Sequence, residues 1–393
     1  MEYLSVKETA QRLNVTERAV QKWAKEGKIP GAHKFSGAWV IPKDATTPDG
    51  IVNNDEANHK KRTAMLLLNS AYKTGSCLDF IAGIEDADDR NLCLGEYYYF
   101  SGQVDKAIAM VEEYLDSSDE ALKYSASLIC LFAGMAAGHG NLSSFALKTL
   151  NEQFVQGFNK EDTPTEAHAV GVFTETTAHM LLDIPIDSSV PDMKEYMSSL
   201  PGGIKMQACY VLAHQAYQDG DYVKALTIAD MAIYLSPQLF PIATIYVHIV
   251  ATMALMKLRR SDEAKQRMQM AWELAQKDNI IEPFVEHHGL LQGMIEVFFK
   301  KDYPHVYRQI INGVYLFADA WRNIHNLYAE FEVTDKLTTT EFIIAMLYGH
   351  GWSVKEVAVH MGLSSRTVTN YISTIYSKLY INDRKELVKY ILK

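Results

Sequence analysis

The sequence predicts a mainly α-helical protein: a helical-repeat solenoid flanked by two short helical modules, of which the N-terminal one also carries a small β wing. Almost every segment of residues 61–335 has helical periodicity, and few segments favour strands. Both ends contain Ser or Thr followed three residues later by Glu, which is the pattern of a capping box at a helix start. The balance of charge also changes near both ends.

The chain has 393 residues, which is long enough for several domains and a sizeable core. Its 48% hydrophobic and 22% charged residues are ordinary for a folded protein. The four cysteines are far apart and form no Cys-x-x-Cys pair, so we expect reduced thiols and a cytoplasmic protein. No apolar run reaches about 18 residues and no signal core opens the chain, so neither a membrane span nor secretion is expected.

Charge is distributed unevenly along the chain, whose formal net charge is -10. Residues 1–48 hold eight basic and five acidic side chains, and residues 337–393 hold seven and four. Residues 49–336 hold 23 basic and 39 acidic side chains. Mildly basic ends on an acidic centre are expected when only the ends approach phosphate.

The N-terminal module begins with two short predicted helices. Ser5 and Glu8 form a capping box at the start of the first helix, and Asn14 ends it. Thr16 caps the second helix, which stops at Gly27.

Two β-prone runs around Gly37 then predict a hairpin, and a polar, turn-rich stretch follows. We therefore expect domains at 1–45, 61–335 and 336–393, with a linker at 46–60.

The segments LSVKETAQRLNV, TERAVQKWAKEGKIPGA and WVIP resemble the excisionase-like and MerR-like winged helix-turn-helix family over residues 3–45. The resemblance implies that the second helix and the wing contact DNA, with Trp23 and Trp39 in the core. A protein-docking role is the alternative. The candidate DNA contacts are Thr16, Arg18, Gln21, Lys22 and, beside His33 on the wing, Lys34.

The C-terminal module carries more specific motifs. Capping boxes at Thr338/Glu341 and Ser353/Glu356 predict two helices, and the turn GLSS at 362–365 leads into a third. A fourth helix can be capped by Asn382. The segment LTTTEFIIAMLYGHGWSVKEVAVHMGLSSRTVTNYISTIYSKLYINDRKELVKYIL resembles a LuxR-type helix-turn-helix DNA-binding domain over its full length.

The LuxR resemblance implies that the helix from Ser365 to about Leu379 enters the major groove of double-stranded DNA. Asparagine can read adenine with two hydrogen bonds, which makes Asn370 the first candidate for base discrimination. By matching positions, Thr369, Asn370 and Ser373 would face bases, and Arg366, Thr367 and Lys378 would hold phosphates.

Three residues depart from the LuxR pattern. Thr369 stands where the family often has Lys, Tyr371 where it often has His, and Tyr380 where it usually has Gly. Fewer cations imply weaker binding and lower salt sensitivity. A small helical cap that makes only protein contacts is the alternative to a DNA-binding domain.

The middle resembles tetratricopeptide repeat (TPR) sequence when Gly102 is aligned with Gly220. A third hairpin at 245–278 has Arg259 where the turn glycine would be. The positions that suit two packed helices are Leu212, Ala213, Tyr217, Ala225, Ala229, Ala232 and Pro237 in the better copy, Leu94, Gly95, Tyr98 and Ala107 in the weaker, and Ala264 and Ala271 in the third.

The stretch AWELAQKDNIIEPFVEHHGLLQGMI at 271–295 resembles the sensor region of MalT-like regulators. A solenoid of this kind can bind a peptide, a small molecule or a protein, but the sequence does not indicate the ligand-binding residues. The aromatic run 97–100 is interpreted as repeat packing, and His287 with His288 as a solvated turn rather than a metal site.

No catalytic motif, Walker A loop or paired-cysteine metal site occurs, so we expect no enzyme activity, no cofactor and no metal. The sequence thus predicts an effector-responsive transcription regulator that is a homodimer through Leu387, Val388, Tyr390 and Ile391. The alternative is a TPR-type peptide- or protein-binding adaptor, similar to pheromone receptors, in which the terminal modules dock partners.

Overall fold

The chain forms two compact units, Met1–Arg62 and Thr63–Lys393. The predicted linker at 46–60 lies outside the described residues. The computed structural model describes residues 3–13, 17–35, 38–43, 45, 62–157, 165–328 and 336–390.

The first unit contains a three-stranded antiparallel sheet and two helices. The strand order is β1-β3-β2, with β1 at Tyr3–Ser5, β2 at His33–Phe35 and β3 at Ala38–Pro42. The helices are α1 (Val6–Leu13) and α2 (Glu17–Lys25). The β2–β3 hairpin is the predicted wing. Strand β1 was not predicted, because three residues are too few to show an alternating pattern.

The predicted capping box at Ser5 and Glu8 is present at the start of α1. The backbone N–H of Ser5 donates to Glu8 Oε2 (2.8 Å), and the N–H of Glu8 donates to Ser5 Oγ (3.2 Å). Trp23 is buried in the core of this unit, as expected. Trp39 is only half-buried, and the Lys34 ammonium lies 5.6 Å from the centre of its ring. Asn14 and Thr16 lie outside the described residues.

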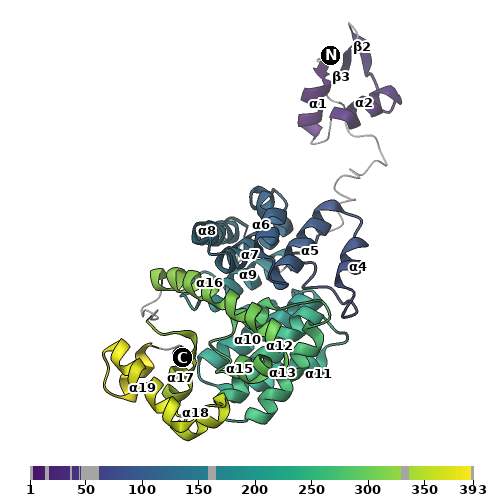
Figure 1. The fold of residues 1–393 in the computed structure, drawn as a ribbon. Coiled ribbons are helices and arrows are strands. Elements are labelled where there is room, and N and C mark those ends of the chain that lie inside the picture. The colour runs from purple at the N-terminus through teal and green to yellow at the C-terminus, as the bar shows by residue number, and fades with distance from the viewer. Residues whose placement is uncertain are drawn as a thin grey trace. The chain divides into compact units, whose positions relative to one another are not determined.

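Helices are the only regular secondary structure in the described part of the second unit (Figure 1). Its α-helices are α4 (Cys77–Ala82), α5 (Ala87–Phe100), α6 (Val104–Val111), α7 (Glu120–Ala136), α8 (Gly140–Gly157), α9 (Glu166–Leu182), α10 (Gly202–Gln218), α11 (Tyr222–Leu235), α12 (Pro241–Lys257), α13 (Ser261–Ala275), α14 (Glu282–Glu286), α15 (Met294–Asp302), α16 (Pro304–Tyr328), α17 (Thr339–Gly349), α18 (Val354–Met361), α19 (Ser365–Leu379) and α20 (Arg384–Leu387). Short 3-10 helices are η1 (Glu112–Asp116), η2 (Met193–Ser199) and η3 (Val388–Tyr390).

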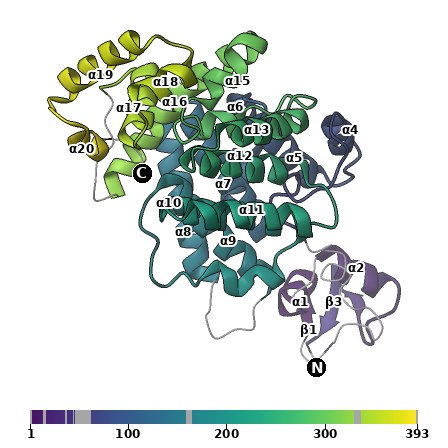
Figure 2. The same cartoon turned by 90° about the horizontal axis from the view of Figure 1, so that it is seen from below.

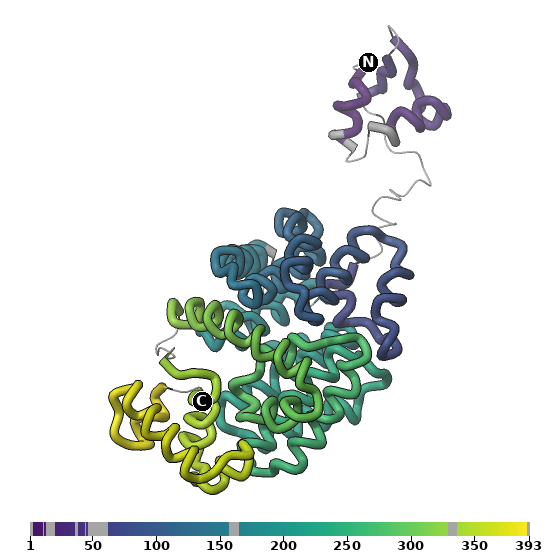
Figure 3. The backbone as a smooth tube through the Cα atoms, viewed as in Figure 1, coloured from purple at the N-terminus to yellow at the C-terminus, as the bar shows by residue number. Residues whose placement is uncertain are grey.

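Consecutive helices pack as pairs, which Figure 3 traces along the chain: α5 with α6, α7 with α8, α10 with α11, and α12 with α13. The turns after α5, α10 and α12 share a left-handed residue: Gly102 (φ 73°), Gly220 (φ 80°) and Arg259 (φ 59°). The alignment on Gly102 and Gly220 therefore identified equivalent turns. Ala232, predicted as one of the small packing residues, is only half-buried. The other predicted alanines of the helices after these turns are fully buried, namely Ala107, Ala225, Ala229, Ala264 and Ala271.

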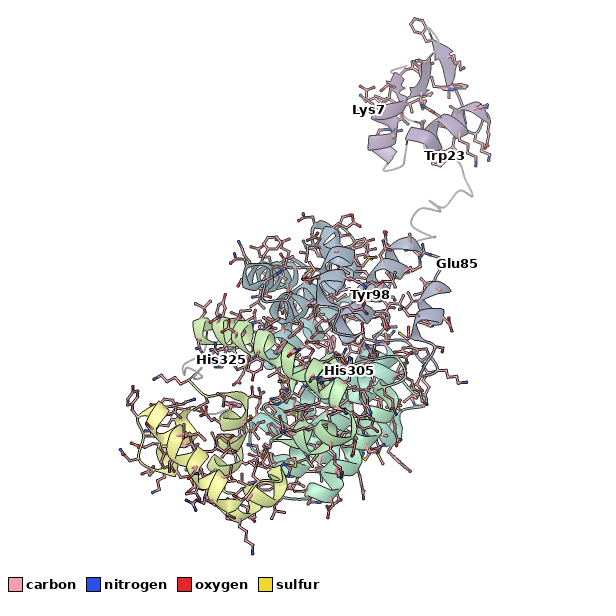
Figure 4. The ribbon with its side chains drawn as sticks, in the orientation of Figure 1. Lys7, Trp23, Glu85, Tyr98, His305 and His325 are labelled. Carbon is pink, nitrogen blue, oxygen red and sulfur yellow. The ribbon has the colours of Figure 1, made fainter. Side chains whose placement is uncertain are left out.

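Helix α16 crosses the paired helices and contacts α7, α8, α9, α14 and α15 (Figure 2). His305 and His325 mark its two ends in Figure 4. Trp321 Nε1 donates to the Leu181 carbonyl oxygen (2.7 Å), and His325 Nδ1 lies 2.9 Å from the Leu182 carbonyl oxygen. These bonds hold α16 against the end of α9.

The C-terminal helices belong to the same compact unit as the helical middle. Ile343–Leu347 in α17 are all buried. His360 Nε2 in α18 lies 2.9 Å from the Gln292 carbonyl oxygen, and Arg259 Nη1 lies 3.2 Å from Glu356 Oε1. One apolar core therefore continues from the paired helices into α17 and α19.

No helix among the described residues is both long enough and apolar enough to span a membrane.

The crossing of α5 and α6 supplies a stability test. A Cβ added at Gly95 would lie 2.2 Å from Cγ1 of Val111, which is fully buried, whereas one added at Gly140 meets nothing within 4 Å. Because a buried valine has little freedom to move, Gly95→Ala should lower the free energy of unfolding by about 1–3 kcal/mol. Gly140→Ala should change it by less than about 0.5 kcal/mol. Urea unfolding followed by circular dichroism measures both, and equal effects would contradict this packing.

Candidate nucleic-acid interface

Helices α18 and α19 are joined by a tight turn. Gly362 ends α18 at φ 64°, a backbone conformation that residues with a Cβ rarely adopt. The N–H of Leu363 then donates to the Ala358 carbonyl oxygen (2.9 Å). Ser364 then caps α19, because its Oγ accepts from the N–H of Thr367 (3.1 Å). The predicted capping boxes at Thr338/Glu341 and Ser353/Glu356 are both present. The turn thus fixes the direction in which α19 leaves α18.

Helix α19 has one buried and one exposed face. Its buried face is formed by Val368, Ile372, Ile375 and Leu379. The exposed side chains include Arg366, Thr369, Asn370 and Ser373, and Thr367 is half-buried beside Ser364. All three predicted base contacts therefore share the exposed polar face of the helix that the turn presents.

Lys378 differs from the other predicted phosphate contacts because it has a carboxylate partner within the domain. Its Nζ lies 2.6 Å from Oε2 of Glu341, a residue that is 5% exposed. Burial on its own would raise the pKa of Glu341, but hydrogen bonds from Lys378 and Thr338 outweigh it and hold that pKa below its ordinary value. The pair ties α19 to α17.

Tyr380, which replaces the glycine usual in LuxR-type domains, ends α19 at φ 55°. The backbone there has the left-handed conformation that glycine adopts without cost. Its ring is 86% exposed and lies 5.4 Å from the Lys336 ammonium, so little packing supports this tyrosine.

Two expectations for the last helix need correction. Asp383, not Asn382, is the N-cap of α20, because its Oδ1 accepts from the N–H of Glu386 (2.9 Å). Leu387 is 1% exposed in the core of the unit, so it does not offer a free apolar face to a second copy. Val388 is 42% exposed, and Ile391 lies outside the described residues.

The N-terminal candidates lie on α2 and the wing. Gln21 and Lys22 are exposed on α2, and Lys34 is exposed on β2. Thr16 and the side chain of Arg18 lie outside the described residues. Figure 4 labels the buried Trp23 on the same helix.

Two models of known families match the chain. Residues 335–391 match bacterial regulatory proteins of the luxR family. Residues 3–45 match a helix-turn-helix domain. No curated protein and no solved structure gives a significant match. The chain therefore carries helix-turn-helix domains at both ends of a helical middle, and its C-terminal domain is the DNA-binding type found in transcription regulators.

The sequence did not single out a group of buried polar residues in the helical middle. His287 and His288 are 1% and 3% exposed, so the expectation of a solvated turn is wrong. His287 Nδ1 donates to the Pro283 carbonyl oxygen (2.8 Å), and its Nε2 accepts from the Tyr210 hydroxyl (2.6 Å). Hydrogen-bond partners make this burial possible, and Tyr210 lies on α10, too far away in the sequence for a local pattern to reveal it.

Replacing Tyr380 should test the strain at the end of α19. Tyr380→Gly should raise the free energy of unfolding by about 1 kcal/mol, because it removes the cost of a left-handed non-glycine residue. Tyr380→Ala should give no such gain, since alanine keeps that cost and the ring packs little. Thermal unfolding compares the two variants, and equal stability would contradict the assignment of strain.

Removing the Lys378 ammonium should destabilise the protein at neutral pH. Lys378→Met leaves the buried Glu341 oxygen without this partner, and the expected loss is about 1–3 kcal/mol. Because the folded-state pKa of Glu341 is lowered, the pair stabilises the fold above the ordinary carboxyl pKa and loses its effect as pH falls through the folded value. Wild type and variant should therefore converge in acid.

Lys148→Met is the matched control, since the Lys148 side chain is 71% exposed and its ion pair with Glu152 lies on the surface. A loss of stability that is the same for both lysines, or that does not depend on pH, would show that the Lys378 pair has no structural role.

Proposed function

We propose that this protein is a cytoplasmic transcription regulator that reads double-stranded DNA with the exposed face of α19, and that a signal received by the helical middle controls this binding. One observation carries the proposal: α19 follows a tight helix-turn-helix turn and presents Arg366, Thr369, Asn370 and Ser373 on one open face. A helix of this kind fits the major groove, where each base pair displays a distinct pattern of donors and acceptors.

Each exposed side chain has a role that follows from its chemistry. The Asn370 amide can accept from and donate to an adenine edge, which makes it the main base reader. Arg366 binds a phosphate, and Thr369 and Ser373 add shorter polar contacts. Lys378 contributes less to DNA binding than Arg366, since its ammonium is engaged by Glu341.

The N-terminal domain adds a second contact with DNA. Gln21 and Lys22 on α2 and Lys34 on the wing are exposed, as contacts to bases and phosphates require. The acidic middle favours contact through the ends alone, because it repels phosphate along most of the chain.

The helical middle is the TPR-like sensor of the regulator. Its repeated turns and buried alanines are the features of such an array. The active species is a homodimer, and two-fold symmetry then requires a pseudo-palindromic operator.

Selection of DNA by the full chain from random oligonucleotides, followed by gel-shift titration of variants, tests this function. Asn370→Ala should cost about 1–3 kcal/mol on the selected site and relax preference at one base pair. Arg366→Ala should weaken binding to selected and random DNA alike and lower the salt slope by about 1.

Lys148→Ala is the control, because it removes an exposed cation on α8 and should leave affinity unchanged. Failure to enrich any sequence would contradict the proposed function and favour the alternative in which the terminal modules dock proteins. Equal losses for Asn370→Ala on selected and random DNA would contradict its role as a base reader.

A further inference from the structure

The second unit contains a cavity of about 760 Å³ between α10, α14, α16 and the start of α17. Sites for small molecules usually measure about 300–1,000 Å³. Part of the wall comes from the helical middle and part from Leu337, Thr339 and Phe342, at the beginning of the C-terminal domain. A molecule in this cavity would touch both.

One side of the cavity is apolar. Val314, Phe317 and Trp321 line it from α16, and Leu337 and Phe342 line it from the C-terminal domain. The indole N–H of Trp321 already donates to the Leu181 carbonyl oxygen. These side chains suit an aromatic or aliphatic body.

His214 on α10 supplies a buried acceptor. It lines the cavity and is 3% exposed. Its Nδ1 contacts Met180 Sδ, and its Nε2 has no hydrogen-bond partner. In the tautomer that carries the proton on Nδ1, Nε2 is a hydrogen-bond acceptor. Burial lowers the pKa of His214 to about 3, so the ring is neutral.

Glu286 supplies a second acceptor. Its side chain is 5% exposed and lines the same cavity. Oε1 accepts from the hydroxyls of Tyr99 and Tyr246, but Oε2 has no hydrogen-bond partner. Unpaired buried polar atoms are costly, so both Oε2 and His214 Nε2 gain when a ligand donates to them.

The charges around the cavity are mostly negative. Asp183, Asp219 and Asp319 line it, and Arg322 is the cation among the lining residues. Burial raises the pKa of Glu286 to about 7, and a cation bound beside it favours the charged form of this carboxyl. Arg322 is itself paired with Asp319. The cavity therefore offers a negative potential and acceptors that lack donors.

We propose that this cavity binds a small organic cation, made of an apolar body and a protonated amine that donates to His214 Nε2 and Glu286 Oε2. This inference rests on the proposed function, because it names the chemical class of the signal. The bound molecule contacts Thr339 and Phe342, which lie within two residues of Glu341 in the sequence. Since Glu341 holds Lys378 of α19, occupancy of the cavity changes how α19 is presented to DNA.

Fluorescence titration of the full chain with dansylcadaverine tests the ligand class. This probe joins an aromatic body to a primary amine, its N-acetylated form is neutral, and dansyl-6-aminohexanoate is an anion. The amine should bind at least tenfold more tightly than both analogues. Equal or tighter binding of either analogue, or no binding of the amine, would overturn the proposal.

Variants test whether the probe binds in the cavity. His214→Phe removes the acceptor and should weaken binding at least tenfold, whereas His248→Phe, at a buried histidine that does not line the cavity, should leave it unchanged. Ala318→Trp fills the cavity from an exposed position and should weaken binding as much, even where His214→Phe fails to fold. Unchanged binding by Ala318→Trp would refute the site.

Gel shifts on the selected DNA, with and without dansylcadaverine, test the link to α19. The probe should change the affinity of the wild-type protein for the selected DNA at least fivefold and should leave the DNA affinity of Ala318→Trp unchanged. An unchanged wild type would overturn the coupling. DNA binding without the probe tests the proposed function separately. If the protein bound no DNA but bound the probe in the predicted pattern, the proposed function would be refuted and the ligand site would still hold.

Discussion

The burial of the middle of α17 is the constraint on which the second unit depends. Ile343–Leu347 are each at most 1% exposed, so this helix must be covered on every side. Helices α18, α19 and α20 cover part of it, and a Cβ built at Gly293, in the helical middle, would lie 3.1 Å from Cγ2 of Ile343. A helix-turn-helix domain attached in this way takes its orientation from the helical middle.

Two residues stand in place of glycine, and one of them, Arg259, helps to hold the domain. Arg259 adopts a left-handed conformation in the turn between α12 and α13, and its guanidinium donates to the Gly351 carbonyl oxygen and pairs with Glu356. Tyr380 adopts the same conformation at the end of α19. Arg259 gives up the ease with which glycine adopts this left-handed turn, but it gains a contact with the C-terminal domain. Nothing in the structure explains the tyrosine.

Local signals in the sequence predicted local structure. Capping boxes located the starts of α1, α17 and α18, and the turn at Gly362 located α19 to the residue, because caps and turns depend on neighbours in the chain. The misplaced cap of α20 arose because Asn382 and Asp383 are both good caps, and only the geometry decides between them.

Features that depend on distant residues escaped prediction. His287 and His288 were assigned to a solvated turn, because the sequence does not show that His287 meets Tyr210 of α10, 77 residues away. The cavity gathers side chains from Phe132 to Phe342, and no spacing in the sequence brings them together. The exposed face of α19, by contrast, follows from helical periodicity, and it contains the three residues that the sequence analysis expected to face bases.

The central claim is that this face of α19 meets DNA in the intact chain. Photocrosslinking tests it most directly, with an azidophenacyl group attached to Ser373→Cys on α19 or to Tyr234→Cys, a site on α11 that is 82% exposed. The reaction of the native cysteines, measured on the parent chain, is subtracted. The account predicts strong crosslinking to the selected DNA from position 373 and only background from position 234. Equal yields from the two positions would contradict it.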